Sequence, residues 1–403
     1  MNAADEKATD EAHEKTALSD SVVRPRIIAG VGCLTRLGEL AREFGGTNVL
    51  LVTDQGIVAA GHAARVQQAL EAVGIKVSLY DRVRENPTTV DVDACLAVAK
   101  TASVDLIVGL GGGSAMDTAK GCNFLLTNGG KMRDYWHTTS ATKPFLPFIA
   151  IPTTAGTGSE CQSYALIADE ETHQKMACGD SNVMARVALL DPTLTVTQPR
   201  HVTACTGLDA VGHAVETLVT TKRNARSHIF AREAFSLLNA NFSVVLAQPD
   251  LLAARGAMQL GATYAGLAIE NSMLGAAHAC ANPLTAQFGV VHGQAVATML
   301  PIVVRYNAHD PAAAMLYEEL AVHAGLSAPG NVHAAVDALV QRLNELLVIA
   351  GLPNNLAASG VTAAAIDALA ENAATQWTGT FNPRPVKAPE FRELYRAALV
   401  GGG

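Results

Sequence analysis

Four residues in the second half of the chain have the types and spacing of a divalent-metal site. Asp209 and His213 lie four residues apart in the segment GLDAVGHAVE, so a helix would place both on one face. His278 and His292 follow in the segment HACANPLTAQFGVVHG. One carboxylate and three imidazoles suit a borderline cation such as Fe²⁺ or Zn²⁺. The alternative is that each histidine is an ordinary hydrogen-bonded residue without a ligand.

The segment around the two later histidines contains no charged residue other than histidine. Residues 271–304 include no Asp, Glu, Lys or Arg. A membrane span needs about 20 predominantly apolar residues, whereas this segment is interrupted by His278, Pro283, His292 and several amides. We therefore expect it to lie in the protein interior and not in a membrane. Burying Asp209 there without a cation would be costly, which favours the metal site.

A glycine-rich turn follows the apolar run VDLIV. Gly111, Gly112 and Gly113 precede Ser114, at which a helix is predicted to begin. Glycine tolerates positive φ and lets backbone N–H groups approach an anion, and a helix N-terminus adds a favourable dipole. The pattern predicts a cradle for the pyrophosphate of a dinucleotide, and the alternative is a tight turn without a ligand. The Walker pattern GxxxxGK[ST] is absent.

A second polar loop, PTTAGTGSE, follows another apolar run. Its hydroxyl groups belong to Thr153, Thr154, Thr157 and Ser159. Alone it could be turn chemistry, but ligands of parallel sheets bind beyond the strand ends, where two such loops would meet. Asp54 ends the run NVLLVTD and could accept a hydrogen bond from an adenosine ribose, which would favour NAD over NADP. Alternatively, Asp54 only caps the next helix.

The elements that must position these residues divide the chain into two parts. Short apolar runs predict strands at residues 48–53, 76–80, 105–108, 145–151 and 187–190. Helical patterns such as 60–72 and 90–102 lie between them, and this alternation is typical of a mostly parallel sheet. After residue 200 the chain is rich in Ala and Leu with helical periodicity. We predict a polar leader (1–20), an α/β nucleotide-binding domain (21–197) and an all-helical metal-binding domain (198–403), with a ligand cleft between the two domains.

Composition narrows the class of protein. The 403 residues are 49% hydrophobic and 16% charged, which excludes a disordered chain and indicates a large, well-buried enzyme or an oligomer. The net charge of −8 without a long basic run argues against a nucleic-acid partner. Seven scattered cysteines without a CxxC pair are typical of reduced thiols in the cytoplasm. Residues 1–20 lack the apolar region of a secretory signal.

In their order along the chain, these motifs resemble the iron-containing (group III) alcohol dehydrogenase family. The resemblance rests on GGGSAMDTAK, PTTAGTGSE, GLDAVGHAVE, HACANPLTAQFGVVHG and FNPRP, and it covers about residues 25–400. Close kin are lactaldehyde reductase, 1,3-propanediol dehydrogenase and butanol dehydrogenases. The resemblance implies a dehydroquinate synthase-like fold and hydride transfer between NAD(H) and a small primary alcohol or its aldehyde. The alternatives are a glycerol-dehydrogenase-like or dehydroquinate-synthase-like enzyme on the same scaffold, or a non-catalytic role.

The resemblance also implies roles for single residues. The metal would be Fe²⁺, with Zn²⁺ as the alternative, and a homodimer or larger homo-oligomer would use a strand near residues 24–28. The implied metal ligands, through which catalysis would act, are Asp209, His213, His278 and His292. The implied cofactor-binding residues are Asp54, Asn86, Gly111, Gly112, Gly113, Ser114, Asp117, Thr153, Thr154, Thr157, Ser159 and Lys175.

One position departs from the family pattern. Many members read HxxxHP in the third motif, where the second histidine lies near the nicotinamide and relays protons. This chain reads HACANP, with Asn282 in that place. An amide cannot carry a proton near neutral pH as imidazole does. The proton path therefore stays open, with the nicotinamide ribose and water as the alternative route, and so does the identity of the alcohol.

Overall fold

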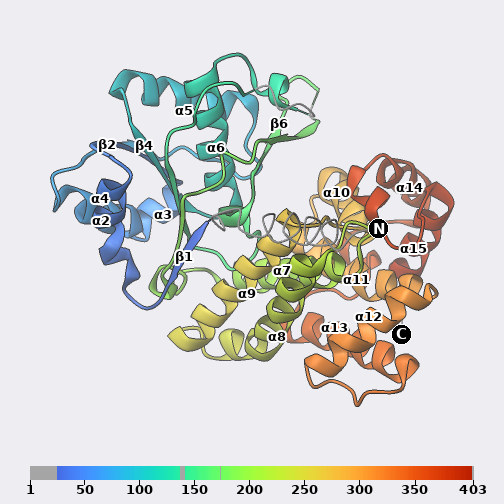
Figure 1. Cartoon of the computed structure of the whole chain (residues 1–403). Coiled ribbons are helices and arrows are strands. Elements are labelled where there is room, and N and C mark those ends of the chain that lie inside the picture. Colours follow the sequence, from blue (N-terminus) through green and yellow to red (C-terminus); the bar gives the residue numbers. More distant parts are fainter. Residues whose placement is uncertain (1–24, 137–140, 173, 402–403) are drawn as a thin grey trace, which may run out of the picture.

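The first half of the protein is built on a six-stranded, all-parallel sheet. This computed structural model describes residues 25–136, 141–172 and 174–401. The strands lie in the spatial order β1-β8-β5-β4-β2-β3, and every adjacent pair is parallel. Figure 1 shows this half of the molecule, with β1, β2 and β4 labelled, beside the helices of the second half. Their bounds are β1 (Arg26–Ala29), β2 (Asn48–Val52), β3 (Lys76–Tyr80), β4 (Leu106–Gly111), β5 (Phe148–Pro152) and β8 (Val187–Leu190).

Helices cover both faces of this sheet, which is why its central strands are apolar without interruption. Alternate side chains of β2 point to opposite faces. Val49 and Leu51 join the hydrophobic core on one face, and Leu50 and Val52 join the core on the other. Every residue of β4 and β5 is buried. The helices are α2 (Leu37–Glu43), α3 (Gln55–Ala59), α4 (His62–Glu71), α5 (Thr89–Ala102) and α6 (Gly113–Asn128).

An antiparallel hairpin interrupts the alternation of strands and helices. It consists of β6 (Tyr164–Ala168) and β7 (Lys175–Gly179), with Tyr164 opposite Gly179. β6 packs against α6, and β7 packs against the short 3₁₀ helix η2 (Met132–Tyr135). No strand was predicted here: β6 is a short apolar run (YALIA), and β7 (KMACG) has a charged residue at one end and a glycine at the other. It extends one domain toward the other and contributes a wall of the cavity described below.

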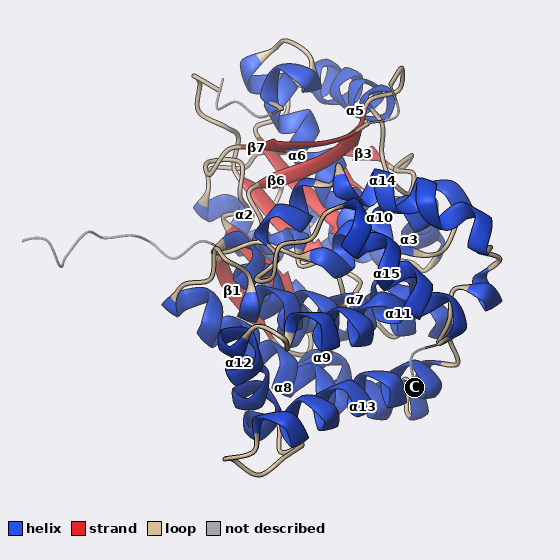
Figure 2. Ribbon diagram, turned by 90° about the vertical axis from the view of Figure 1, so that its right-hand side faces the viewer, coloured by secondary structure: helices blue, strands red, loops and turns tan. Residues whose placement is uncertain are grey.

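The second half is a helical domain (Figure 2). α7 is central to it, and nearly every residue from Thr203 to Val219 is buried. A helix buried on all sides must be enclosed by its neighbours, and α7 packs against α8, α9 and α11. The helices are α7 (Arg200–Val219), α8 (Ala225–Ala247), α9 (Leu252–Glu270), α10 (Ala276–Phe288), α11 (His292–Asn307), α12 (Pro311–His323), α13 (Val332–Ala350), α14 (Ile366–Ala374) and α15 (Ala388–Val400).

The predicted architecture, an α/β half followed by a helical half, is confirmed. The strands expected at 76–80 and 187–190 have those bounds, and the strand expected at 105–108 extends to Gly111. The boundary between residues 197 and 198 stays a prediction, and the proposed leader at 1–20 lies outside the described residues. Of the helices described, none is long and apolar enough to cross a membrane.

Candidate metal centre and cofactor cleft

Three of the four predicted metal ligands converge where α7, α10 and α11 pack together. Asp209 Oδ1 lies 3.4 Å from His278 Nε2 and 3.7 Å from His292 Nε2. One ligand atom each from Asp209, His278 and His292 lies within 4.8 Å of the other two. The fourth, His213, lies beside this group: its Nε2 is 3.6 Å from Asp209 Oδ2, and its ring stacks on His278 with 4.8 Å between centroids.

Glycines allow α7 and α11 to approach closely enough to bring His292 next to Asp209. A Cβ at Gly293, directly after His292, would collide with the backbone carbonyl of Cys205 on α7. A Cβ at Gly212 would lie 2.5 Å from Val296 Cγ1 on α11. Larger residues at either position would separate α7 from α11 and move His292 away from Asp209.

Glu216, on the same face of α7 as Asp209 and His213, orients the ring of His278. Glu216 Oε2 lies 2.5 Å from His278 Nδ1, and Glu216 Oε1 accepts from the Ala277 N–H at 2.6 Å. Asn382 Oδ1, in the FNPRP motif, accepts from the N–H of the preceding residue, Ala276, at 3.3 Å. These acceptors satisfy the start of α10, whose N-cap is a glycine. With Nδ1 held by Glu216, Nε2 of His278 faces the other ligands.

Electrostatics in the cluster follow from burial and from the two carboxylates. Burial lowers the pKa of His213 to about 4. Burial also opposes the charged form of His278, but Glu216 and Asp209 raise the pKa of His278 to about 9. Burial alone would raise the pKa of Asp209, yet the adjacent imidazoles hold that pKa well below its usual range. Asp209 is therefore an anion. The two carboxylates favour positive charge at His278, and a metal ion bound at Nε2 would take the place of the proton there.

Nδ1 of His213 is buried without a hydrogen-bond partner among the described residues. The same holds for two atoms that lie 3.4 Å apart in the cluster, Asp209 Oδ1 and His278 Nε2. Buried polar atoms are nearly always paired, so such orphans indicate an additional group at the site. A divalent cation would satisfy both atoms at once. The residues present therefore fit a resident metal ion.

The glycine loop, residues 109–114, joins β4 to α6 as predicted. Gly111 has a φ of +146°, and a Cβ there would lie 2.9 Å from Ala115 Cβ. A Cβ on Gly113 would lie 2.9 Å from Thr157 Cγ2. No side chain caps α6, so its first N–H groups remain available for an anion. Only glycine leaves this cradle open, which fits a dinucleotide pyrophosphate.

Asp54 caps α3 and also borders the glycine loop. Its Oδ1 accepts from the Ile57 N–H at 2.9 Å, so it caps α3. Its Oδ2 lies 3.5 Å from the position of a Cβ built on Gly111, so the other oxygen borders the glycine loop. One oxygen therefore fixes the carboxylate and the other remains next to the cradle.

The threonine loop, residues 152–160, faces the glycine loop and also contacts the helical domain. Thr154 lies against Gly112 and Thr157 against Gly113, whereas Thr153 is buried. On the other side, a Cβ on Gly158 would collide with the backbone of Gly266 on α9. The loop therefore lies between the nucleotide cradle and the second domain.

Hydrogen bonds of Ser159, Asp117 and Lys120 hold this loop against α6. Ser159 Oγ donates to Asp117 Oδ1 at 2.9 Å. The buried Lys120 donates to Ser159 Oγ at 2.9 Å, to the Ser159 carbonyl at 2.7 Å and to the Tyr164 carbonyl at 2.8 Å. Asp117 and Ser159 are 8% and 4% exposed, so their observed partners are protein groups. Lys120 links α6, the threonine loop and β6.

Asn86 and Lys175 lie at the edge of the cradle. The Asn86 N–H donates to Ser114 Oγ at 3.3 Å, and Lys175 Nζ donates to Asn86 Oδ1 at 3.4 Å. Asn86 has a φ of +53°, which turns the chain toward α6. Both residues also line the cavity, so they join the cradle to the space that leads to the metal cluster.

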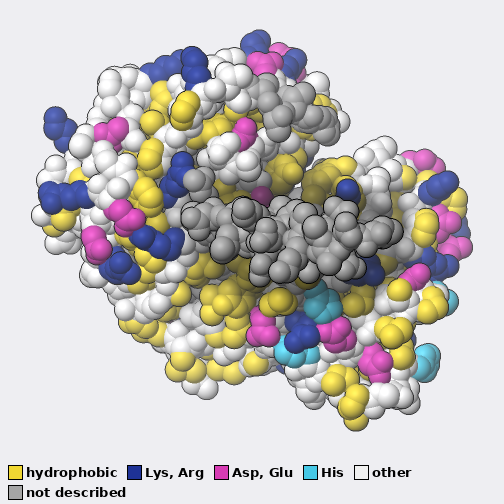
Figure 3. Space-filling model, viewed as in Figure 1, with side chains coloured by type: hydrophobic (Ala, Val, Ile, Leu, Met, Phe, Trp, Pro, Cys, Tyr) yellow, Lys and Arg dark blue, Asp and Glu magenta, His cyan; other side chains and the backbone are white. Residues whose placement is uncertain are grey.

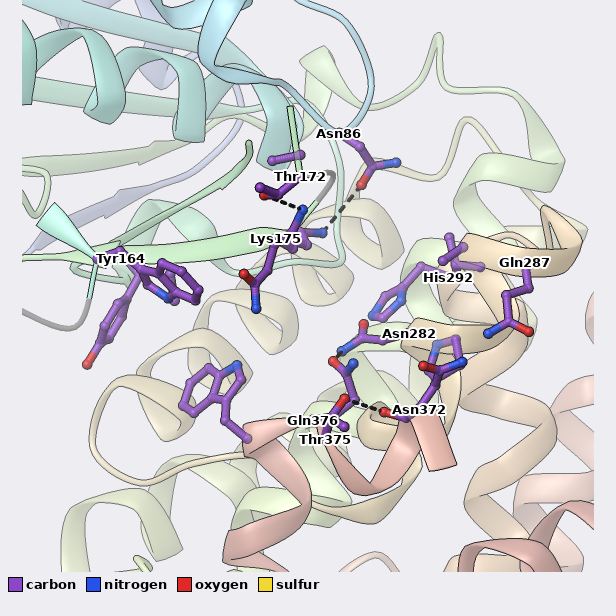
Figure 4. Close-up of a pocket in the computed structure, with 18 of the residues that line it drawn as sticks. Asn86, Tyr164, Thr172, Lys175, Asn282, Gln287, His292, Asn372, Thr375 and Gln376 are labelled. Atoms are coloured by element: carbon purple, nitrogen blue, oxygen red, sulfur yellow. Dashed lines mark hydrogen bonds between the residues drawn. The ribbon is translucent and has the colours of Figure 1, made fainter. Parts of the chain in front are cut away.

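A cavity of about 1270 Å³ lies between the two domains. Figure 3 shows the molecule hollowed between them. The hairpin side of the cavity includes Lys175 and Tyr164, and the helical side includes His292, Asn282 and Gln376 (Figure 4). Asn282 Nδ2 donates to Gln376 Oε1 at 2.9 Å. Asn282 is one helical turn after His278, so an uncharged amide pair lies next to the metal cluster.

Family models match both halves of the chain. The model described as iron-containing alcohol dehydrogenase matches residues 24–192, and the C-terminal model of the Fe-containing alcohol dehydrogenase family matches residues 203–399. The chain belongs to the iron-containing alcohol dehydrogenase family. The predicted family and class of oxidoreductase are confirmed.

Relatives of this alcohol dehydrogenase match over nearly their whole lengths. Alcohol dehydrogenase 4 of Schizosaccharomyces pombe is 35% identical over 370 residues, covering 92% of this chain and 86% of the relative. NAD-dependent methanol dehydrogenase of Bacillus methanolicus is 31% identical, covering 95% and 100%. A crystal structure of 1,3-propanediol oxidoreductase superimposes with a TM-score of 0.90 at 31% identity, covering 95% and 100%.

The sequence analysis missed two supporting residues of this alcohol dehydrogenase. Glu216 lies seven residues after Asp209, so helical periodicity alone places it on the ligand face of α7. Lys120 lies three residues after Asp117 on α6, but its partners Ser159 and Tyr164 are distant in sequence, so no local pattern indicated their contact.

Proposed function

We propose that this alcohol dehydrogenase transfers a hydride between NAD(H) and a small primary alcohol or its aldehyde, using Fe²⁺ or Zn²⁺ held by Asp209, His213, His278 and His292. The observation that carries the proposal is the convergence of Asp209, His278 and His292, with His213 beside them, around the unpartnered Asp209 Oδ1 and His278 Nε2. When bound, the cation supplies a Lewis acid for the substrate oxygen and the nicotinamide exchanges the hydride.

The protein's own contribution is orientation and electrostatics. Glu216 holds His278 in the tautomer that presents Nε2 to the cluster. The glycine loop and Thr157 shape the pyrophosphate cradle. Asp54 Oδ2 would accept from a ribose hydroxyl and repel a 2′-phosphate, which favours NAD over NADP. Asn282 carries no proton that could titrate near neutral pH, so the proton of the alcohol leaves by another group or by water.

We also infer a cytoplasmic homodimer or larger homo-oligomer. All seven cysteines are free thiols, which suits a reducing compartment. β1 is an edge strand of the sheet and pairs only with β8 among the described residues. A second copy could pair along that edge, and size-exclusion chromatography with light scattering measures the assembly.

The decisive experiment is a substrate panel with NAD and with NADP. The protein is stripped with a chelator, reloaded with Fe²⁺ or Zn²⁺, and assayed by NADH absorbance with small alcohols and aldehydes. We expect metal-dependent turnover with a preference for NAD. If reloaded protein shows no metal-dependent redox activity with any alcohol or aldehyde, the proposal is wrong and a lyase on the same scaffold becomes the alternative.

Replacing Glu216 with glutamine is expected to weaken metal affinity about 10- to 100-fold, because outer partners of ligating histidines have effects of this size. The amide keeps the shape of Glu216 but removes the charge that faces His278 Nδ1. Chelator competition measures metal affinity, and Glu345→Gln on the exposed part of α13 is the matched control. Unchanged metal affinity in Glu216→Gln would show that Glu216 does not orient a ligand.

A further inference from the structure

The two most exposed Phe, Tyr or Trp side chains in the described part of the chain both line the cavity. Tyr164 is 36% exposed and Trp377 is 42% exposed, and no other aromatic side chain among the described residues is as exposed. Both line the cavity, as does Trp136. The two tryptophans of the chain therefore border one space, although aromatic residues make up only 5% of the sequence.

The two exposed rings are held in place by the protein. Tyr164 on β6 is paired with Gly179 on β7, and a Cβ on Gly179 would lie 2.5 Å from Tyr164 Cδ1. The tyrosine ring therefore lies over a position that only glycine can occupy. Trp377 begins the 3₁₀ helix η7 (Trp377–Phe381) and makes an edge-to-face contact with Phe381, with 6.0 Å between centroids. Neither ring needs a ligand to reach its position.

The rings come from the two sides of the cleft. Tyr164 belongs to the hairpin of the α/β domain (Figure 4), and Trp377 belongs to the helical domain. The same cavity is also lined by His292 of the metal cluster and by the polar side chains of Asn282 and Gln376. The cavity thus offers a polar end for reaction and an aromatic wall for a large apolar group.

Neither the metal cluster nor the pyrophosphate cradle gives these rings a partner. Covering aromatic surface is favourable, and ring pairs add stacking or edge-to-face attraction. A short aliphatic alcohol would leave the rings largely uncovered. The cavity of about 1270 Å³ exceeds the roughly 300–1,000 Å³ of ordinary ligand pockets, so a ring fits beside the nicotinamide.

We propose that the substrate is an aromatic primary alcohol or its aldehyde, with the ring held by Tyr164 and Trp377. This inference rests on the proposed function and specifies its substrate class. In the forward direction the carbinol C–H bond breaks, its electron pair moves with the hydrogen to NAD⁺, and the hydroxyl proton leaves to solvent. The aryl alcohol is oxidised to the aldehyde, and NAD⁺ is reduced to NADH.

The first test compares kcat/KM for benzyl alcohol and for 1-butanol in the metal-loaded enzyme. We expect benzyl alcohol to be preferred by the wild type. Trp377→Leu should lower the ratio of kcat/KM for benzyl alcohol to kcat/KM for 1-butanol about tenfold, mainly by raising KM for benzyl alcohol. Gly179→Ala should lower the same ratio, because it displaces the Tyr164 ring without removing it. Val348→Ala, at an exposed apolar position on α13, should leave the ratio unchanged.

The second test uses fluorescence without turnover. Because both tryptophans line the cavity, benzyl alcohol added without cofactor should change the intrinsic emission of the wild type, and Trp377→Phe should lose most of that change. An NADH titration of Trp377→Leu checks whether the ring serves the cofactor. Thermal unfolding shows whether each variant is folded.

The outcomes separate this inference from the function on which it depends. Metal-dependent oxidation of 1-butanol without a preference for benzyl alcohol would overturn the aromatic substrate and leave the dehydrogenase intact. The aromatic substrate would also be overturned if Trp377→Leu weakened NADH binding but left the ratio of kcat/KM for benzyl alcohol to that for 1-butanol unchanged. The Trp377 ring would then belong to the cofactor site. Absence of metal-dependent activity with every alcohol would instead contradict the proposed function.

Discussion

Replacing Asp209 or His278 with alanine is expected to abolish turnover while NADH still binds. Asp209 is the common neighbour of the three histidines, at 3.4 to 3.7 Å. Removing it leaves His213, His278 and His292 without the only carboxylate among the predicted ligands. A Lewis acid contributes several kcal/mol to the transition state, so the rate should fall roughly 10³-fold or more.

Three measurements on each variant check this result: initial rate, bound metal by elemental analysis, and NADH affinity by fluorescence. His333→Ala is the control, because that side chain is 94% exposed. The nucleotide cradle lies in the other domain, so NADH affinity should change little. Near-normal activity in a metal-stripped double variant would contradict the metal role.

Replacing Gly111 with alanine is expected to weaken NADH binding about 100-fold. Gly111 has a φ of +146°, which residues other than glycine rarely adopt. The new Cβ would also lie 2.9 Å from Ala115 Cβ. Relief of this contact shifts the start of α6 relative to the threonine loop. A misplacement of about 1 Å in a positioning element lowers the rate of catalysis on the order of 100-fold, and we expect a loss of the same order in NADH affinity.

Gly61→Ala is the matched control for this prediction. Gly61 also has a positive φ, +79°, but its new Cβ would have no atom within 4 Å. Both variants should be destabilised in thermal unfolding, and only Gly111→Ala should lose NADH affinity. A folded Gly111→Ala protein with wild-type affinity would show that the glycine loop does not cradle the cofactor.

Local patterns were enough to predict the order of the domains, and together with the family resemblance they selected the four residues proposed as metal ligands. Asp209 and His213 share a helical face by spacing alone, and the uncharged segment around His278 indicated burial. Their distances to His292 depend on the contacts of Gly212 and Gly293 with neighbouring helices, which no single segment encodes. Sequence patterns indicate which residues face inward, but not which inward faces touch.

The remaining features depend on long-range contacts. Asp54 was predicted either to cap a helix or to bind the cofactor ribose. The structure shows the cap and places the other oxygen beside the glycine loop, and the ribose contact stays a prediction. The support of the Tyr164 ring by Gly179 depends on the pairing of β6 with β7, which neither segment encodes alone. The aromatic wall was therefore not visible in the sequence.

The contact between Gly158 and Gly266 limits how the two domains can move. Main chain touches main chain there, and a side chain on either residue would collide with the other backbone. Main chain packed this closely leaves little room for one domain to slide over the other. We therefore expect any opening and closing of the cleft to be a rotation about this contact, with the largest displacement at the far rim.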